Sequence, residues 1–350
     1  MQIQSSDELT RTSSLVAQVV FDLRQNLLVR TDSSRGAIER SLARVMRKLL
    51  SPLWNSAKRG RWIYGNVYGR KMMMPAEHPI VATVTEAPLY NIPLALAVAV
   101  LAKAQTPLAI IDVGANIGET VAAIEQTTPD RCIYFCIEPE PELAQFCRLN
   151  FNANARVVVE EAFVGECKDA NVTLVDDGRA NPSTTFSISP SAKALSPLDR
   201  LAASFIEQHG VDLIKTDTEG YDFTILRSAE SILQKYKPAV YFEWYPELIV
   251  KLNERPECIF EYLQQYGYRH WVLFTRRGEL HCEISDPTKR FIEVLAKAAI
   301  NCADISYFDV FGSTDSLASS ELTDLYLYRA KYQQLTPLLA ERAKHEVKQT

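Results

Sequence analysis

A strand that runs straight into a glycine-containing turn constrains the fold more than any other part of this chain. Residues 107–113 are apolar and rich in β-branched side chains, which is typical of a buried strand. Gly114 and Gly118 follow, and residues 119–126 have the pattern of a helix. Glycine lets a backbone approach a ligand closely, and the free N–H groups of a helix N-terminus face that ligand. The segment therefore predicts an α/β fold with a pocket for a nucleotide-like ligand.

The next strand ends in an acidic residue. Residues 131–137 form a continuous apolar run, as expected in a parallel sheet that is covered on both faces. Glu138 comes directly after it, and Pro139 stops the strand before a helix over 141–151. A carboxylate at this strand end can accept hydrogen bonds from the two hydroxyl groups of a ribose. A solvated surface acid is the alternative, but the position of Glu138 after the glycine turn favours ribose binding.

The turn itself distinguishes two nucleotide-like cofactors. An NAD site requires the pattern G-x-G-x-x-G, whose middle glycine admits the pyrophosphate, whereas Gly114 and Gly118 enclose three other residues. The loop also contains no basic residue that could meet a phosphate. S-adenosylmethionine has no phosphate, and its charged end is an amino acid. Asp112 suits the ammonium group and the Asn116 side chain suits the carboxylate, so the turn favours S-adenosylmethionine over NAD.

Several motifs, in order along the chain, resemble those of FkbM-family methyltransferases. They are IDVGANIG at 111–118, IEPEP at 137–141, SPLDR at 196–200, LIKTDTEG at 213–220 and AVYFEW at 239–244, preceded by a similar lead-in at 74–91. The resemblance covers residues 75–275 and departs from the family at Thr216 and Thr218, where apolar residues are commoner. It implies an α/β fold of the class I methyltransferase type, a Rossmann-like doubly wound sheet that is mostly parallel with one late antiparallel strand. It also implies O-methylation with S-adenosylmethionine, often of sugars, glycans or natural products.

The chain divides into three expected regions. Residues 1–74 are predicted to be helical and basic, residues 75–330 to form the methyltransferase domain, and residues 331–350 to be a charged tail. Alternating strands and helices are the signature of a doubly wound sheet. Strands are expected at 108–113, 132–137, 156–160, 211–217, 239–244 and 269–275, then a hairpin into 279–285, a helix at 287–300 and a further strand candidate at 305–311.

The basic N-terminal region has a second notable pattern. Residues 35–71 contain ten Lys and Arg residues against a single acid, Glu39, with aromatic residues interleaved. Pro52 is expected to end a helix whose apolar residues fall on one stripe, namely Ala37, Ile38, Leu42, Val45, Met46, Leu49 and Leu50. Such a segment is a candidate for peripheral contact with an anionic membrane or an anionic glycan carrier. A solvated helical cap over the cleft and a homo-oligomer contact are the alternatives.

Candidate catalytic residues lie where strands end. Asp217 and Glu219 follow the strand 211–217 and Glu243 ends the next one, at the sheet edge where open α/β sheets bind ligands. An alkyl hydroxyl must lose its proton, which a carboxylate or a histidine can accept, and His78 in the lead-in is a reserve candidate. Asp217 and Glu219 could instead cap the helix that follows. A divalent cation is compatible with these acids, but no ligand pattern supports a metal site.

The cofactor site is expected to draw on both strand ends and on the lead-in. The residues assigned to it are Asp112, Gly114, Asn116, Gly118, Glu119, Glu138, Pro139, Ala162, Asp217 and Tyr90.

Composition limits the expected binding partners and the cellular compartment. A net charge of −5 with a pI of about 5.7 gives no basic footprint for nucleic acid. The seven cysteines lack a C-x-x-C pair and are expected to be free thiols in a reducing compartment. No secretory signal and no apolar run of membrane-spanning length is evident, so a cytoplasmic protein is expected.

The function that these features favour is O-methylation of a hydroxyl group of a sugar, in a glycan or a glycosylated metabolite. A non-sugar natural product or a lipid hydroxyl is the alternative acceptor. Two other classes remain open. An NAD-linked oxidoreductase would also use Glu138, and a non-catalytic scaffold would dock on a membrane or partner through its basic segment.

Overall fold

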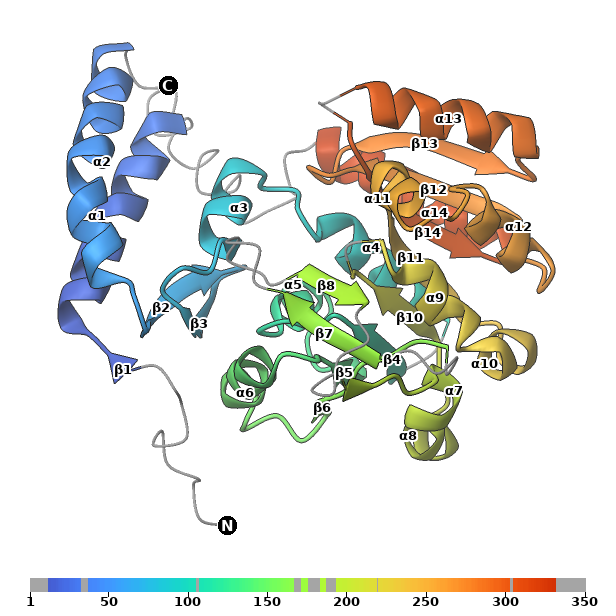
Figure 1. The fold of residues 1–350 in the computed structure, drawn as a ribbon. Coiled ribbons are helices and arrows are strands. Elements are labelled where there is room, and N and C mark those ends of the chain that lie inside the picture. The colour runs from blue at the N-terminus through green and yellow to red at the C-terminus, as the bar shows by residue number, and fades with distance from the viewer. Residues whose placement is uncertain are drawn as a thin grey trace.

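The computed structural model describes residues 12–32, 37–104, 107–166, 171–175, 183–186, 193–218, 220–302 and 305–331 (Figure 1). Most of the expected C-terminal tail, and the candidate residue Glu219, lie outside these ranges. Within them, every helix is too short or too polar to span a bilayer.

An eight-stranded sheet forms the centre of the molecule. From edge to edge it consists of β13 (Leu280–Ser285), β12 (His270–Thr275), β14 (Phe308–Ser313), β11 (Ala239–Trp244), β10 (Leu213–Thr216), β4 (Leu108–Val113), β5 (Cys132–Ile137) and β6 (Val157–Glu160). The five strands from β11 to β6 are parallel to one another. Strand β14 runs antiparallel between β11 and β12, which confirms the expected late antiparallel strand, and β13 pairs antiparallel with β12 at the edge.

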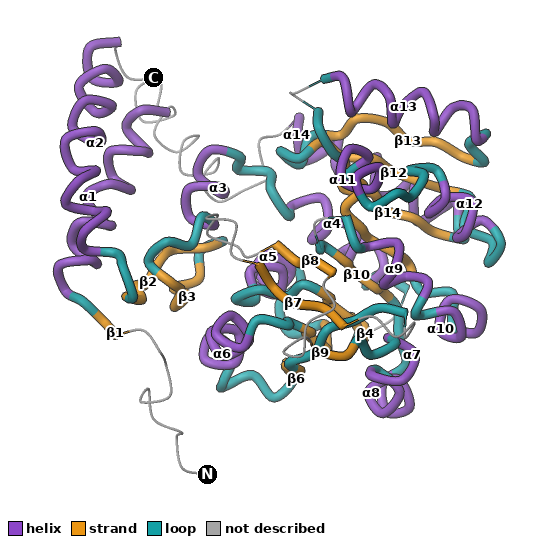
Figure 2. The backbone as a smooth tube through the Cα atoms, in the orientation of Figure 1, coloured by secondary structure: helices purple, strands orange, loops and turns teal. Residues whose placement is uncertain are grey.

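Both faces of this sheet are covered by helices (Figure 2). One face packs against α4 (Ile92–Leu101), α5 (Glu119–Thr127), α6 (Pro141–Asn150) and α14 (Ser316–Lys331). The other packs against α7 (Leu198–Leu201), α8 (Ala203–His209), α9 (Asp222–Arg227), α10 (Glu230–Lys235), α11 (Pro246–Lys251), α12 (Cys258–Gln264) and α13 (Lys289–Asn301). Alternation along each strand divides the core, since Tyr241 packs into the first layer and Phe242 into the second. The doubly wound architecture is therefore as predicted.

The order of the strands indicates at which edge of the sheet a ligand would bind. The chain starts the sheet at β4, builds outward through β5 to β6, and then returns to β10 on the other side of β4. Ligands of open α/β sheets bind beyond the carboxyl ends of the strands at such a switch point. Thr216 and Ile137 both pair with Val113, so the ends of β10, β4 and β5 are level with one another.

The N-terminal region differs from the expectation in two respects. It contains β1 (Thr12–Ser13), α1 (Leu15–Asp32), α2 (Ala37–Ala57), β2 (Arg61–Val67), β3 (Arg70–Pro75) and α3 (Ile80–Glu86). Pro52 lies inside α2 and does not end it, because Trp54 packs against Phe21 of α1 and holds the following turn. Residues 61–75 form an antiparallel hairpin, so the prediction that they are helical is wrong; Ile63, Gly65 and Val67 alternate inward with the period of a strand.

A small inserted sheet separates β6 from β10. It consists of β7 (Asn171–Val175), β8 (Ser183–Phe186) and β9 (Lys193–Ala194). The predicted helix over 221–235 is present as two short helices, α9 and α10.

Candidate active site

The two glycines of the β4–α5 turn are required by their neighbours. Gly114 has a φ of +77°, and a Cβ atom there would lie 2.2 Å from the Asp217 carbonyl oxygen at the end of β10. Gly118 has a φ of +89°, and its Cβ would lie 2.5 Å from the Phe151 ring. Backbone of this kind is strongly unfavourable for L side chains, and the space is already filled. The turn is therefore packed tightly against β10 and the end of α6.

Glu138 holds this turn from the neighbouring strand. Its Oε2 accepts a hydrogen bond from the Asn116 N–H at 2.8 Å, and its Oε1 accepts one from the Glu140 N–H at 2.9 Å. Only 6% of Glu138 is exposed, and this burial raises the pKa of its carboxyl group to about 7. A carboxylate has about four acceptor positions, so two of them remain for a ligand.

His78 and Asn116 form a second pair in the turn. The Nδ1 atom of His78 accepts a hydrogen bond from the Ile80 N–H at 3.3 Å, which places the ring proton on Nε2. That nitrogen donates to Oδ1 of Asn116 at 2.8 Å. Burial lowers the pKa of His78 to about 4. Both ring nitrogens are thus engaged in a neutral imidazole, an arrangement that suits a positioning residue; the base role, for which His78 was a reserve candidate, stays a prediction.

Lys215 is a site residue that the sequence reasoning missed. Its Nζ lies 2.9 Å from Oδ1 of Asp112 and 3.8 Å from Oδ2 of Asp217, and it donates to the Gly114 carbonyl oxygen at 3.0 Å. Burial acts to lower the pKa of Lys215, but the Asp112 and Asp217 carboxylates raise it above its usual value. The fully buried Asp112 therefore has Lys215 as its partner, where a ligand ammonium group was expected. In the sequence, Lys215 could have been noticed as a single positively charged residue within the apolar run of β10.

Glu119 is a second buried acid of the turn, and the Lys215 charge only partly offsets its burial. It is 9% exposed in the first turn of α5, and its Oε2 makes no hydrogen bond within the described part of the chain. Burial raises the pKa of Glu119 to about 8. Burying an unpaired carboxylate is costly unless a cation can approach it. Burial, and then the Asp217 and Glu119 carboxylates among other groups, raise the pKa of the Tyr90 phenol well above its usual value.

A hollow lies beside the turn. It is partly open to solvent. Its walls include Pro139 and Ala162, both expected at the cofactor site, and the residues Val113, Gly114, Phe163, Val164, Leu195, Thr218, Tyr221, Thr224 and Ile225. The walls are mainly apolar, which suits a flat ring system such as a nucleobase.

The remaining acids lie at the ends of β10, β11 and β14. The Asp217 side chain is 39% exposed, whereas Glu243 is buried at 8%. Glu243 pairs in register with Asp309 of β14, so both side chains lie on the same face of the sheet. Burial, and then the Asp217 carboxylate, raise the pKa of Asp309 well above its usual value. Asp309 was also missed, although an acid inside an apolar strand could have marked it.

No cluster of three or more His, Cys, Asp or Glu side chains in the described ranges is arranged to hold a metal ion.

Comparison with known protein families gives the site a chemical identity. A family model described as the methyltransferase FkbM domain matches residues 112–270, which include the turn and the ends of β5, β10 and β11. Residues 112–270 are an FkbM methyltransferase domain. The chain is therefore an S-adenosylmethionine-dependent methyltransferase, as the resemblance implied. No curated protein matches the sequence.

Solved structures similar to this chain include other methyltransferases. One is "TYW2" from M. jannaschii in complex with AdoMet, at 12% identity and a TM-score of 0.37, covering 72% of this chain and 84% of that one. Another is the plantazolicin methyltransferase BpumL in complex with SAH, at 11% identity and a TM-score of 0.32, covering 86% of this chain and 100% of that one. Similarities this low transfer neither a substrate nor a residue role.

The residues of the FkbM domain fit S-adenosylmethionine. The cofactor carries two positive groups, and the buried Glu119 oxygen lacks a partner among the described residues. It carries a ribose, and Glu138 has acceptor positions left at the end of β5. It carries a nucleobase, and an apolar hollow lies between Pro139 and Ala162.

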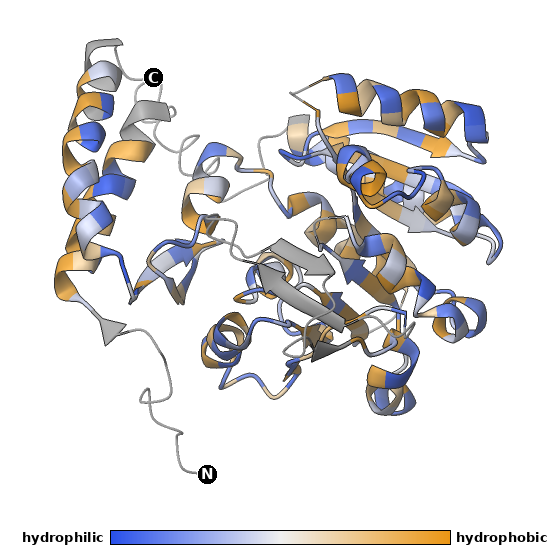
Figure 3. Ribbon diagram, in the orientation of Figure 1, coloured by the Kyte–Doolittle hydropathy of each residue, from blue (hydrophilic) through white to orange (hydrophobic). Residues whose placement is uncertain are grey.

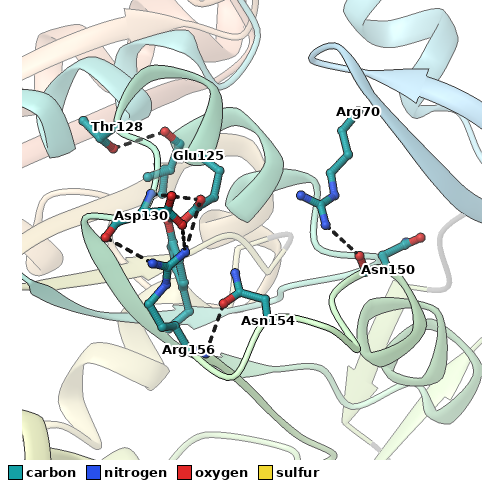
Figure 4. Close-up of polar contacts among 9 residues, drawn as sticks. Arg70, Glu125, Thr128, Asp130, Asn150, Asn154 and Arg156 are labelled. Carbon is teal, nitrogen blue, oxygen red and sulfur yellow. Dashed lines mark hydrogen bonds and ion pairs between the residues drawn. The ribbon is translucent and has the colours of Figure 1, made fainter. Parts of the chain in front are cut away.

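Asn150 connects the turn to the N-terminal region, and its contact with Arg70 is drawn in Figure 4. Its Nδ2 donates to the carbonyl oxygens of Met73 at 2.9 Å and Ile117 at 3.0 Å, and its Oδ1 accepts from the Met73 N–H at 2.7 Å. Arg70 donates to the Asn150 carbonyl oxygen at 3.0 Å. One side chain at the end of α6 therefore joins strand β3 to the cofactor turn.

Proposed function

We propose that this enzyme transfers the methyl group of S-adenosylmethionine to a hydroxyl group of a sugar unit. The observation that carries the proposal is the set of acids and aromatic rings gathered at the ends of β11 and β14, next to the cofactor turn. A sugar presents hydroxyl groups, which donate to carboxylates, and C–H faces, which stack on aromatic rings.

The aromatic part of this proposed acceptor site is a pair of tyrosines. Tyr245 follows β11 and Tyr307 precedes β14, and the antiparallel pairing of these strands brings the two to the same sheet edge. Their ring centroids are 5.3 Å apart, and both residues are partly exposed. Aromatic rings of this kind combine an apolar face with a polar hydroxyl group. Tyr245 and Tyr307 would thus form a platform beside Glu243 and Asp309.

The cofactor would occupy the other side of the turn. In this proposal Glu138 accepts hydrogen bonds from the ribose, and Pro139 and Ala162 contact the nucleobase. Glu119 and Asn116 bind the amino-acid end, and Tyr90 borders it. When bound, S-adenosylmethionine supplies a methyl group activated by the positive sulfur. Holding two reactants in a productive orientation can recover about 7–11 kcal/mol of a barrier.

Proton removal from the acceptor would fall to a carboxylate. Burial, and then the neighbouring Asp217 carboxylate, raise the pKa of Asp309, and the Asp217 backbone packs against Gly114 of the cofactor turn. A general base works best when its pKa is near the working pH, and the raised pKa of Asp309 moves it in that direction. We assign the base function to this pair. Glu243 holds an acceptor hydroxyl, and Lys215 keeps Asp217 oriented.

The test uses radiolabelled S-adenosylmethionine and a panel of free sugars, glycosides, lipid alcohols and phenols. Label transfer to an oxygen of a sugar, identified by mass spectrometry and NMR, is the expected result. Asp217→Asn and Asp309→Asn should keep cofactor affinity and lose turnover, because an amide keeps the shape but does not take the proton. Transfer only to a non-sugar acceptor, or tight NADH binding without S-adenosylmethionine binding, would refute the proposal.

A further inference from the structure

The helical hairpin of α1 and α2 stands to one side of the sheet (Figure 1). Helix α2 packs on α1 through the face that carries Arg47, Ser51 and Trp54. The Arg24 guanidinium donates to the Arg47 carbonyl oxygen and to Oγ of Ser51, both at 3.0 Å. The Phe21 and Trp54 rings are 5.9 Å apart. Positions 47, 51 and 54 lie on one helical face, so this face is turned towards α1.

The apolar face of α2 points away from that contact. Leu42 is 60% exposed and Leu49 is 68% exposed, and the stripe is completed by Val45, Met46 and Leu53, which are also exposed. Their spacing of three and four residues makes a continuous strip of roughly 16 Å, at 1.5 Å per residue. An amphipathic helix normally turns such a strip towards the core. Helix α1 adds exposed apolar side chains of its own, at Leu15, Val16, Val19 and Leu23.

Positive charge flanks this strip. Arg44 and Lys48 are exposed one turn apart on α2, and Arg59 is exposed just after its end. The sequence has no Asp or Glu between Glu39 and Glu77. The mixture of blue and orange along α2 in Figure 3 shows this amphipathic pattern. Helices with an apolar strip and a cationic flank lie in the plane of anionic membranes, with the strip at the boundary of headgroups and acyl chains.

We propose that the α1–α2 hairpin binds the surface of an anionic membrane, with the α2 strip inserted and Arg44 and Lys48 at the lipid phosphates. Charge favours this occupant over a second copy of the chain. A symmetric contact through the strip would bring two rows of cations together, and the 40–76 segment has no acid to compensate them. An anionic surface compensates them directly.

The experiment is co-sedimentation of the full-length protein with vesicles of phosphatidylcholine alone or mixed with phosphatidylglycerol, at low and high salt. Binding to the mixed vesicles that weakens with salt is expected. Leu42→Glu should abolish it. Leu317→Glu, at an equally exposed leucine of α14, is the matched control and should bind like the wild type. Lys48→Ala should lower the partition coefficient roughly five-fold, since each cation near the surface contributes about 1 kcal/mol.

Two results would overturn the proposal. One is the absence of binding to the mixed vesicles at low salt. The other is a lipid-free dimer, seen by analytical ultracentrifugation, that Leu42→Glu dissociates and Leu317→Glu does not, because the strip is then a contact between copies. S-adenosylmethionine binding by each variant confirms that it is folded.

Discussion

Glu119 is the residue whose ionisation the cofactor should change most. With a pKa of about 8, Glu119 is roughly nine-tenths protonated at pH 7 in the free protein. A bound cation favours the charged carboxylate, so binding should release close to one proton, and affinity should rise with pH between about 6 and 8. Calorimetry in two buffers with different ionisation enthalpies measures this release.

The control for that release is Glu119→Gln, which has no proton to lose. It should retain only the smaller release from Glu138, whose pKa is about 7. If wild-type binding releases no proton at pH 7, Glu119 does not meet the positive end of the cofactor.

His78 should affect binding and not proton transfer. Removing its ring in His78→Ala leaves Oδ1 of Asn116 without its donor, so cofactor affinity should fall by roughly five- to ten-fold, or about 1–1.5 kcal/mol. His78→Gln keeps a donor and should recover most of the affinity. Because the pKa of His78 is about 4, the pH profile of kcat between 6 and 8 should be the same in wild type and variants.

A base role for His78 predicts the opposite effects on cofactor affinity and kcat. His78→Ala would then lose kcat while keeping cofactor affinity. In an Asn116→Ala background, the positioning role predicts that His78→Ala has little further effect on affinity, because the two residues act as a unit.

At the scale of single elements, the β4–α5 turn gives a direct test of packing. Gly114→Ala combines an unfavourable φ with a contact of 2.2 Å to the β10 backbone. Gly60→Ala is the matched control, since its φ is +59° and nothing lies within 4 Å of its added Cβ. The φ cost alone is about 1–2 kcal/mol. Gly114→Ala should therefore destabilise clearly more than Gly60→Ala in chemical denaturation, and equal losses would show that β10 can move aside.

The same turn shows what could be predicted from the sequence. The strand, the glycines, helix α5 and Glu138 are encoded within some thirty consecutive residues, and each was predicted in place. The Lys215–Asp112 pair and Asp309 were not, because they depend on which strands become neighbours: Asp112 and Lys215 are about a hundred positions apart and meet only through the β4–β10 register. The β2–β3 hairpin was missed for a related reason, since its inward side chains are recognisable only against α1 and α3.

At the scale of the whole molecule, Asn150 should transmit cofactor binding to the N-terminal region. Its side chain hydrogen-bonds both Ile117 in the turn and Met73 in β3. Ordering of the turn should therefore also protect the amides of the β2–β3 hairpin from exchange. Hydrogen–deuterium exchange of the wild type should slow on adding S-adenosylmethionine, both over the turn and over residues 70–75. In Asn150→Ala the turn should still gain protection while the hairpin does not.

Asn154 provides the control for this coupling. It lies four residues further along, and the hydrogen bond that its side chain accepts is local, from the Arg156 N–H at 3.1 Å (Figure 4). Asn154→Ala should therefore keep protection in both segments. If Asn150→Ala also keeps hairpin protection, the N-terminal region responds through the wider apolar contact of β2 and β3 with the core and not through this side chain. The β2–β3 hairpin would then be coupled to the cofactor site by packing alone. In that case Asn150 would not connect a lipid-bound α1–α2 hairpin to the cofactor turn.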